Sequence, residues 1–81
     1  MVATKKAKAK GGSYSARELL ARNLVELRAE RGWSQDELAA EADVHRTYVA
    51  AAERQRRNMA IDGIERLARA LQVPMARLFQ D

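Results

Sequence analysis

The fold of this chain is decided by residues 32–54, which read GWSQDELAAEADVHRTYVAAAER. The stretch opens with Gly32, a residue type that commonly follows the end of a helix, and Ser34 can cap the helix that comes next. Glu37 stands three residues after Ser34, which is the spacing of a capping box. This helix is short, because residues 42–45 are followed directly by another helical segment at 46–54. We therefore predict two short helices joined by a tight turn.

The segment before this stretch predicts one longer helix. Ser13 or Ser15 can cap it, and Glu18 completes a capping box with Ser15. Inside the segment, leucines recur at helical spacing at positions 20, 24 and 27. Gly32 ends the helix.

The segment after the stretch predicts two further helices. Residues 55–60 read as a polar loop, Asp62 can cap a fourth helix, and Pro74 fits the first turn of a last short one. No stretch alternates apolar and polar residues for long enough to suggest a strand. A tight join between two short helices is the helix-turn-helix arrangement. The predicted fold is therefore all-α, a compact five-helix bundle over residues 13–81 that contains a helix-turn-helix.

The size and composition of the chain exclude several classes of protein. Its 81 residues make one small domain, with no room for a catalytic cleft between two domains. It has no cysteine, which excludes disulfides and thiolate metal sites. The apolar runs are short and interrupted by charge, so we predict no membrane span and no signal peptide.

The positive charge of the chain is unevenly placed. The formal net charge is +4, but residues 1–12 carry four lysines and no acid, so the remainder is formally neutral. We predict that 1–12 is a disordered basic arm, either a solvated tail or an arm that contacts phosphates. Residues 34–43 contain acids and no base, whereas 45–58 contain four arginines and one acid, Glu53. This arrangement predicts a positive face on a neutral domain, which suits a polyanionic partner.

Residues 20–81 resemble the lambdoid-phage repressor and Cro type of helix-turn-helix domain, the XRE family. The resemblance rests on Gly32-Trp33-Ser34-Gln35 with Glu37-Leu38-Ala39, and on Glu53-Arg54 with Arg57-Asn58. Within the family, HRTYV followed by ER and RN looks most like the controller proteins of restriction-modification systems.

The resemblance implies roles for individual residues. The residues implied in DNA contact are Gln35, His45, Arg46, Thr47, Tyr48, Ala50, Arg54, Arg57 and Asn58. Among them, Gln35 would bind a phosphate and support the recognition helix, whose first turn would face the major groove. Arg28 and Glu53 would form a structural salt bridge. The residues expected at a dimer interface are Ile61, Met75, Leu78 and Phe79.

The chemistry of these side chains supports the roles that the resemblance implies. Several of the residues can also have an ordinary structural or surface role. An arginine in the first turn of a recognition helix can bind guanine O6 and N7 with two hydrogen bonds, but Arg46 can also be an ordinary exposed arginine. Tyr48 can contact DNA or pack on the protein. Gln35 can be a simple surface residue. We expect Trp33 in the core, and the apolar residues of the last two helices belong first of all to the core.

The chain departs from the family pattern at four positions. Asp43 and Gln55 stand where glycine is usual, and Asp43 tolerates left-handed backbone well enough to keep the turn. His45 occupies a cap position where serine, threonine or aspartate is usual. Ala52 stands where a larger aliphatic residue is common.

The expected function is transcriptional regulation, by a homodimer that binds a palindromic double-stranded DNA operator with its third helix in the major groove. The alternative is a protein-interaction module such as an antitoxin or co-regulator. RNA binding is disfavoured because there is no aromatic stacking platform. We expect no enzyme, cofactor, metal or small-molecule ligand, since the chain has one histidine and no glycine-rich nucleotide loop. We expect a cytoplasmic protein associated with the bacterial nucleoid.

Overall fold

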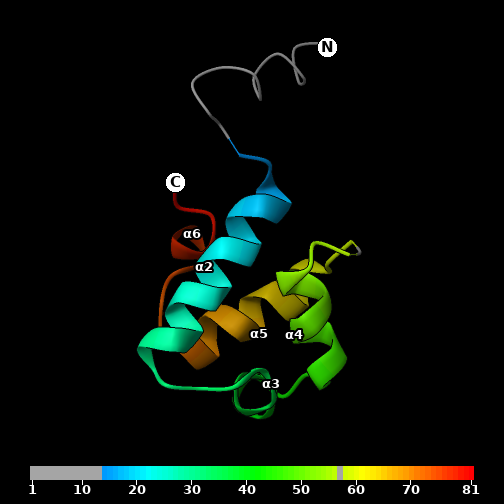
Figure 1. Ribbon diagram of the computed structural model, residues 1–81, viewed down its shortest axis with the longest axis vertical. Helices are drawn as coiled ribbons and strands as arrows, with labels where there is room; N and C mark the ends of the chain where they lie inside the picture. The colour runs from blue at the N-terminus through cyan, green and yellow to red at the C-terminus, as the bar shows by residue number, and fades with distance from the viewer. Residues whose placement is uncertain (1–13, 57) are drawn as a thin grey trace.

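A computed structural model describes residues 14–56 and 58–81. The predicted arm at 1–12 and Arg57 lie outside the described residues. The described part contains no strand and five helices, which are α2 (Ala16–Glu30), α3 (Gln35–Ala42), α4 (Arg46–Glu53), α5 (Ile61–Leu71) and α6 (Met75–Leu78) (Figure 1). The predicted all-α, five-helix fold is confirmed.

The first two helices begin at the predicted capping boxes. The backbone N–H of Glu18 donates to the Ser15 hydroxyl at 3.1 Å, and the Glu18 carboxylate accepts from the Ser15 N–H at 2.7 Å. Ser34 and Glu37 form the same pair of bonds at 3.0 and 2.7 Å. Each box satisfies backbone donors that a helix start would otherwise leave unpaired.

The last two helices begin differently from the prediction. The residue before α5 is Ala60, and Asp62 lies inside the first turn, so the prediction that Asp62 caps this helix is wrong. Its carboxylate is placed to interact with the positive end of the helix dipole instead. Pro74 is the N-cap of α6, one position before the predicted first turn.

Left-handed backbone closes three of the turns without glycine. Asp43, Gln55 and Gln72 have φ of 57°, 60° and 59°, whereas Gly32, with φ of 71°, follows α2 as predicted. Asp43 lets the turn between α3 and α4 form as expected, and Gln55 adopts the conformation that glycine would take at lower steric cost.

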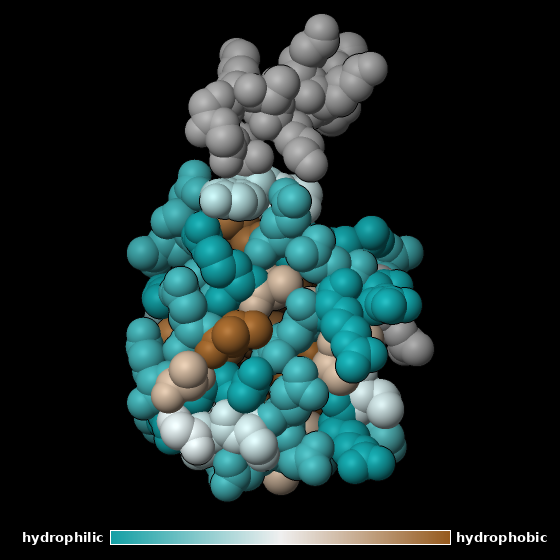
Figure 2. Space-filling view, viewed as in Figure 1, coloured by the Kyte–Doolittle hydropathy of each residue, from teal (hydrophilic) through white to brown (hydrophobic). Residues whose placement is uncertain are grey.

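The core is built mainly from leucines of α2, α3, α5 and α6, and α4 adds Val49 and Ala52. Buried positions include Leu24, Leu38, Leu67, Leu71 and Leu78. The helix α2 packs against α4 and α6, while α3 packs against α4 and α5 (Figure 1). Trp33 is only half-buried, with the Arg31 guanidinium 5.2 Å from its ring centre, so it borders the core rather than filling it. The face shown in Figure 2 is mainly hydrophilic, with a small apolar area near its centre.

A buried amide ties the end of the described chain to α2. The Asn23 side chain is 2% exposed and donates to the carbonyls of Leu78 and Gln80, both at 2.9 Å. Its oxygen accepts from Arg77 at 3.0 Å. These bonds satisfy the buried amide and fix α6 against α2.

Replacing Gln55 with glycine tests the strain at its left-handed backbone. We expect Gln55→Gly to raise the free energy of unfolding by up to about 1 kcal/mol, because glycine adopts positive φ without a steric penalty. Urea denaturation of both proteins measures the change. Gln55→Ala is the control, since it removes the side chain and keeps the penalty. An equal effect of both variants would contradict the expectation.

Candidate nucleic-acid interface

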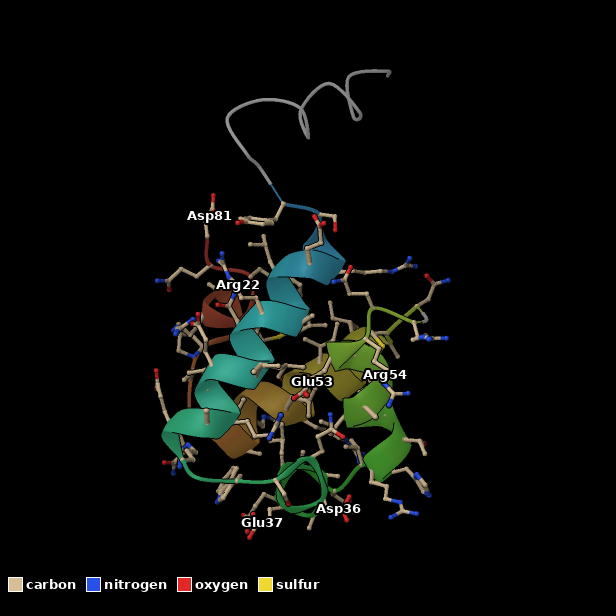
Figure 3. The ribbon with its side chains drawn as sticks, in the orientation of Figure 1. Arg22, Asp36, Glu37, Glu53, Arg54 and Asp81 are labelled. Carbon is tan, nitrogen blue, oxygen red and sulfur yellow. The ribbon has the colours of Figure 1, made fainter. Side chains whose placement is uncertain are left out.

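The Glu53 carboxylate, at the end of α4, joins three helices. It accepts from Nε and Nη2 of Arg28 on α2, at 2.8 and 3.0 Å, and from the side-chain amide of Gln35 on α3, at 2.7 Å. The Glu53 side chain is 7% exposed and that of Arg28 is 19% exposed. Figure 3 shows Glu53 turned toward the middle of the molecule. The Arg28–Glu53 salt bridge expected from the resemblance is present in the structure.

Arg28 also fixes the segment between α2 and α3. Its Nη1 donates to the Trp33 carbonyl at 2.9 Å. The hydrogen bonds to Glu53 raise the pKa of Arg28 above its already high ordinary value. The guanidinium therefore remains charged over the pH range in which the protein is folded, and the network keeps its cation throughout.

Removing the Glu53 carboxylate should strongly destabilise the folded domain. We expect Glu53→Gln to lower the free energy of unfolding by about 3–5 kcal/mol, because the largely buried Arg28 loses its counter-charge. Thermal and urea unfolding measure this. Glu65→Gln is the matched control, because Glu65 pairs with Arg69 on the surface at 2.9 Å and an exposed pair contributes only about 0–1 kcal/mol. Comparable losses in the two variants would refute the assigned role of Glu53.

The first turn of α4 is capped by an imidazole. Nδ1 of His45 accepts from the Thr47 N–H at 3.1 Å and lies 2.9 Å from the Thr47 hydroxyl. In the neutral imidazole, an Nδ1 that accepts leaves the ring N–H on Nε2. His45 thus performs the capping role for which serine or aspartate is usual.

The side chains at the start of α4 differ in exposure. The Arg46 side chain is 69% exposed, and Thr47 is exposed beside it. Ala50, one turn along, is half-buried. The exposed turn presents a guanidinium, a hydroxyl and a methyl group, with a small residue behind them.

Tyr48 packs on the protein in this structure. Its hydroxyl donates to the Ala60 carbonyl at 3.1 Å, and its ring lies where a side chain at Gly63 would overlap it. Burial raises the pKa of the Tyr48 hydroxyl above its ordinary value, so the group remains a donor at neutral pH. The packing alternative for Tyr48 is therefore the one observed, and DNA contact by this residue stays a prediction.

The loop after α4 carries further basic and polar groups. Arg54 and Arg56 are exposed, and Figure 3 shows Arg54 at the end of α4. The Asn58 side chain accepts a hydrogen bond from Arg17 at the start of α2. No local pattern predicts that Arg17 joins this group, because Arg17 and Asn58 are 41 residues apart in the chain. Arg57 lies outside the described residues.

The residues expected at a dimer interface are not equally accessible. Ile61 is 70% exposed, and Met75 and Phe79 are half-buried. Leu78 is 0% exposed and belongs to the core of one protomer, so its assignment to an interface is corrected. Phe79 lines a hollow of about 390 Å³ together with Leu20, Met59 and Ile64.

Among residues 14–56 and 58–81, no group of three histidine, aspartate or glutamate side chains is placed to hold a metal ion. Within the same part of the chain, no helix is long and apolar enough to span a membrane.

Sequence comparison finds relatives that are named as transcription factors or control proteins. The chain is 47% identical over 62 residues to a hypothetical transcription factor of Neisseria meningitidis serogroup B, covering 76% of this chain and 58% of that protein. Control protein C.BamHI of Bacillus amyloliquefaciens is 50% identical over 40 residues, or 49% of each chain. The chain therefore spans about half the length of these two relatives.

Structural comparison finds the same kinds of protein. The structure of the Neisseria factor has a TM-score of 0.78 and 44% identity, covering 82% of this chain and 76% of that one. The restriction-modification controller protein C.AhdI of Aeromonas hydrophila has a TM-score of 0.75 and 36% identity, covering 82% of this chain and 100% of that one. The helix-turn-helix family model HTH_3 matches residues 24–78. The chain belongs to the HTH_3 family of XRE-type helix-turn-helix DNA-binding regulators, which includes controller proteins of restriction-modification systems.

Proposed function

We propose that this chain is a sequence-specific transcriptional regulator that binds a palindromic double-stranded DNA operator as a homodimer, with α4 in the major groove. The observation that carries the proposal is the exposed first turn of α4, which presents Arg46 and Thr47 while Glu53, at the other end, ties the helix to α2 and α3. A reading helix must be both accessible and fixed in orientation, and α4 satisfies both requirements.

The size and chemistry of α4 suit direct readout of bases. Its eight residues give a rod about 12 Å long, and the major groove of B-DNA, about 12 Å wide, admits a helix. Arg46 can donate two hydrogen bonds to guanine, and Thr47 can contact a thymine methyl or accept from a base amine. Ala50, being small, allows the helix backbone to approach the groove.

Phosphate contacts would hold α4 in register. Arg54, Arg56 and the Arg17–Asn58 pair lie in or beside the loop that follows α4, and cations there release counterions when they meet phosphates. Gln35 donates one amide N–H to Glu53, and its second N–H remains for a phosphate. We also expect Arg57 and the lysines of 1–12 to contact phosphates.

A second copy would cover the apolar surface that α5 and α6 leave. Ile61 is the most exposed of the large hydrophobic residues in the described chain, and Met75 and Phe79 are only half-buried. A two-fold dimer built on this surface would present two α4 helices to half-sites about 34 Å apart, one helical turn of DNA. A controller role in a restriction-modification system is part of this proposal and is supported by the names of the relatives. Residence at the bacterial nucleoid is also part of the proposal and would follow from binding to DNA.

Selection from a random duplex library tests the base-reading role. At about 150 mM salt we expect wild-type protein to enrich a palindrome, and Arg46→Ala to lose the preference at one base pair per half-site, because a bidentate arginine–guanine pair is worth about 1–3 kcal/mol of discrimination. Arg56→Ala is the control, since losing a phosphate contact should weaken binding to all sequences about equally. An unchanged motif with Arg46→Ala would remove Arg46 from base readout. No enrichment by wild-type protein would favour the partner-binding alternative.

Sedimentation equilibrium tests the dimer. We expect Ile61→Glu to shift the protein toward a monomer and to weaken operator binding at least tenfold, because a charge on a buried apolar contact costs several kcal/mol. Ile61 is 70% exposed in one protomer, so its helix should remain folded. Val25→Glu is the matched control on α2, where Val25 is 43% exposed. Wild-type protein that sediments as a monomer at all concentrations would contradict the proposed assembly.

A further inference from the structure

We propose that Asp36 is a positioning residue that orients Arg46 and so determines how strictly α4 selects guanine. This inference rests on the proposed function and adds a residue that neither the sequence pattern nor the comparisons singled out. It starts from the ion pair between Arg46 Nη1 and Asp36 Oδ2, which are 3.9 Å apart. The two side chains are 69% and 68% exposed, so the pair lies on the surface that α4 would present to DNA.

The residues around Asp36 are already committed to other contacts. Gln35 is bound to Glu53, and the Glu37 carboxylate accepts from the Ser34 N–H in the capping box. Asp36 is therefore the side chain of the first turn of α3 that is directed to the start of α4. Figure 3 shows Asp36 on the side of α3 nearest α4.

One guanidinium can donate hydrogen bonds to a base and to a carboxylate at the same time. It carries five N–H donors in a planar fork, of which two are needed for guanine O6 and N7. The remaining donors can bind Asp36, so the carboxylate restricts the rotamers of Arg46 without competing for the same protons. An arginine that is held in this way loses less conformational freedom on binding and is less able to turn toward a phosphate.

The Asp36 carboxylate should also lower the affinity of the protein for DNA of any sequence. Asp36 is a negative charge beside a surface that meets phosphates, so it lowers affinity for every sequence equally. Loss of the charge should therefore have two opposite effects. Non-specific affinity should rise while base selectivity falls, a combination that loss of helix stability alone does not produce.

The competing explanation is that Asp36 only stabilises α3. An acidic residue in the first turn of a helix interacts favourably with the helix dipole. In that case Asp36→Asn would lower stability slightly and leave the selected sequence unchanged. Base preference is therefore the property that separates the two roles.

The experiment uses the full chain with Asp36→Asn, Arg46→Ala and the double variant. Binding to the selected operator, to operators changed at the Arg46-dependent base pair, and to unrelated duplex DNA is measured at one fixed salt concentration. Glu41→Gln is the matched control, because it removes one exposed carboxylate from the other end of the same helix. Asp36→Glu tests rescue by a longer carboxylate, and circular dichroism checks that each variant is folded.

With Asp36→Asn we expect the preference for guanine to fall several-fold, to a value between those of wild type and Arg46→Ala. Affinity for unrelated DNA should rise roughly two- to fivefold, the range that one exposed charge interaction supplies. In the Arg46→Ala background, Asp36→Asn should change selectivity no further, and Asp36→Glu should restore part of it. Glu41→Gln should leave selectivity at the wild-type value.

Unchanged base preference with Asp36→Asn overturns the inference while the proposed function stands. The same conclusion follows if Asp36→Asn lowers selectivity equally in the Arg46→Ala background, because Asp36 would then act without Arg46. Failure of the wild-type protein to select any sequence is a different result, because it removes the proposed function and this inference with it.

Discussion

One buried carboxylate, that of Glu53, sets the orientation of the whole helix-turn-helix. It receives three hydrogen bonds, from Arg28 on α2 and Gln35 on α3, while its own backbone ends α4. Replacing a buried ion pair with an apolar contact changes stability little, whereas removing one of its two partners is strongly destabilising. The main effect of this pair is therefore on how the helices are oriented. It fixes the angle of α4 to the two helices beside it, while the first turn of α4, at the opposite end, stays exposed.

The start of α4 is held by a second set of contacts. Asp43 closes the turn in the left-handed conformation, and Arg66 on α5 donates to the Asp43 carbonyl at 2.9 Å. His45 then caps the helix through Nδ1. The end of α4 is therefore fixed through Glu53 and its start through α5, so a helix of only eight residues can keep a defined direction. Helices this short are not stable alone and depend on such tertiary contacts.

Much of this arrangement could be predicted from the sequence, because it follows from local chemistry. The serine–glutamate spacings fixed the starts of α2 and α3, and Gly32 marked the end of α2. The resemblance to the family supplied the pairing of Arg28 with Glu53, which lie 25 residues apart. Local patterns were less informative at the start of α5, where Asp62 is a good capping residue that the chain does not use as one.

The contacts that could not be predicted are those made by single side chains across the fold. An apolar residue in a short helix can face the core or a partner. Leu78 faces the core, and the buried Asn23 amide binds the Leu78 carbonyl. The hydroxyl of Tyr48 binds Ala60, a partner that depends on the path of the loop. The Asp36–Arg46 pair joins residues ten positions apart, on two helices whose relative angle only the turn defines. Long-range geometry of this kind has no signal in a single sequence.

Guanine methylation interference tests whether the first turn of α4 reads bases in the major groove. Operator DNA is methylated sparsely at guanine N7, a major-groove atom that Arg46 would bind, and bound and free fractions are compared. We expect interference at one guanine in each half-site with wild-type protein and none there with Arg46→Ala. Equal interference with both proteins, or none with wild type, would contradict this expectation.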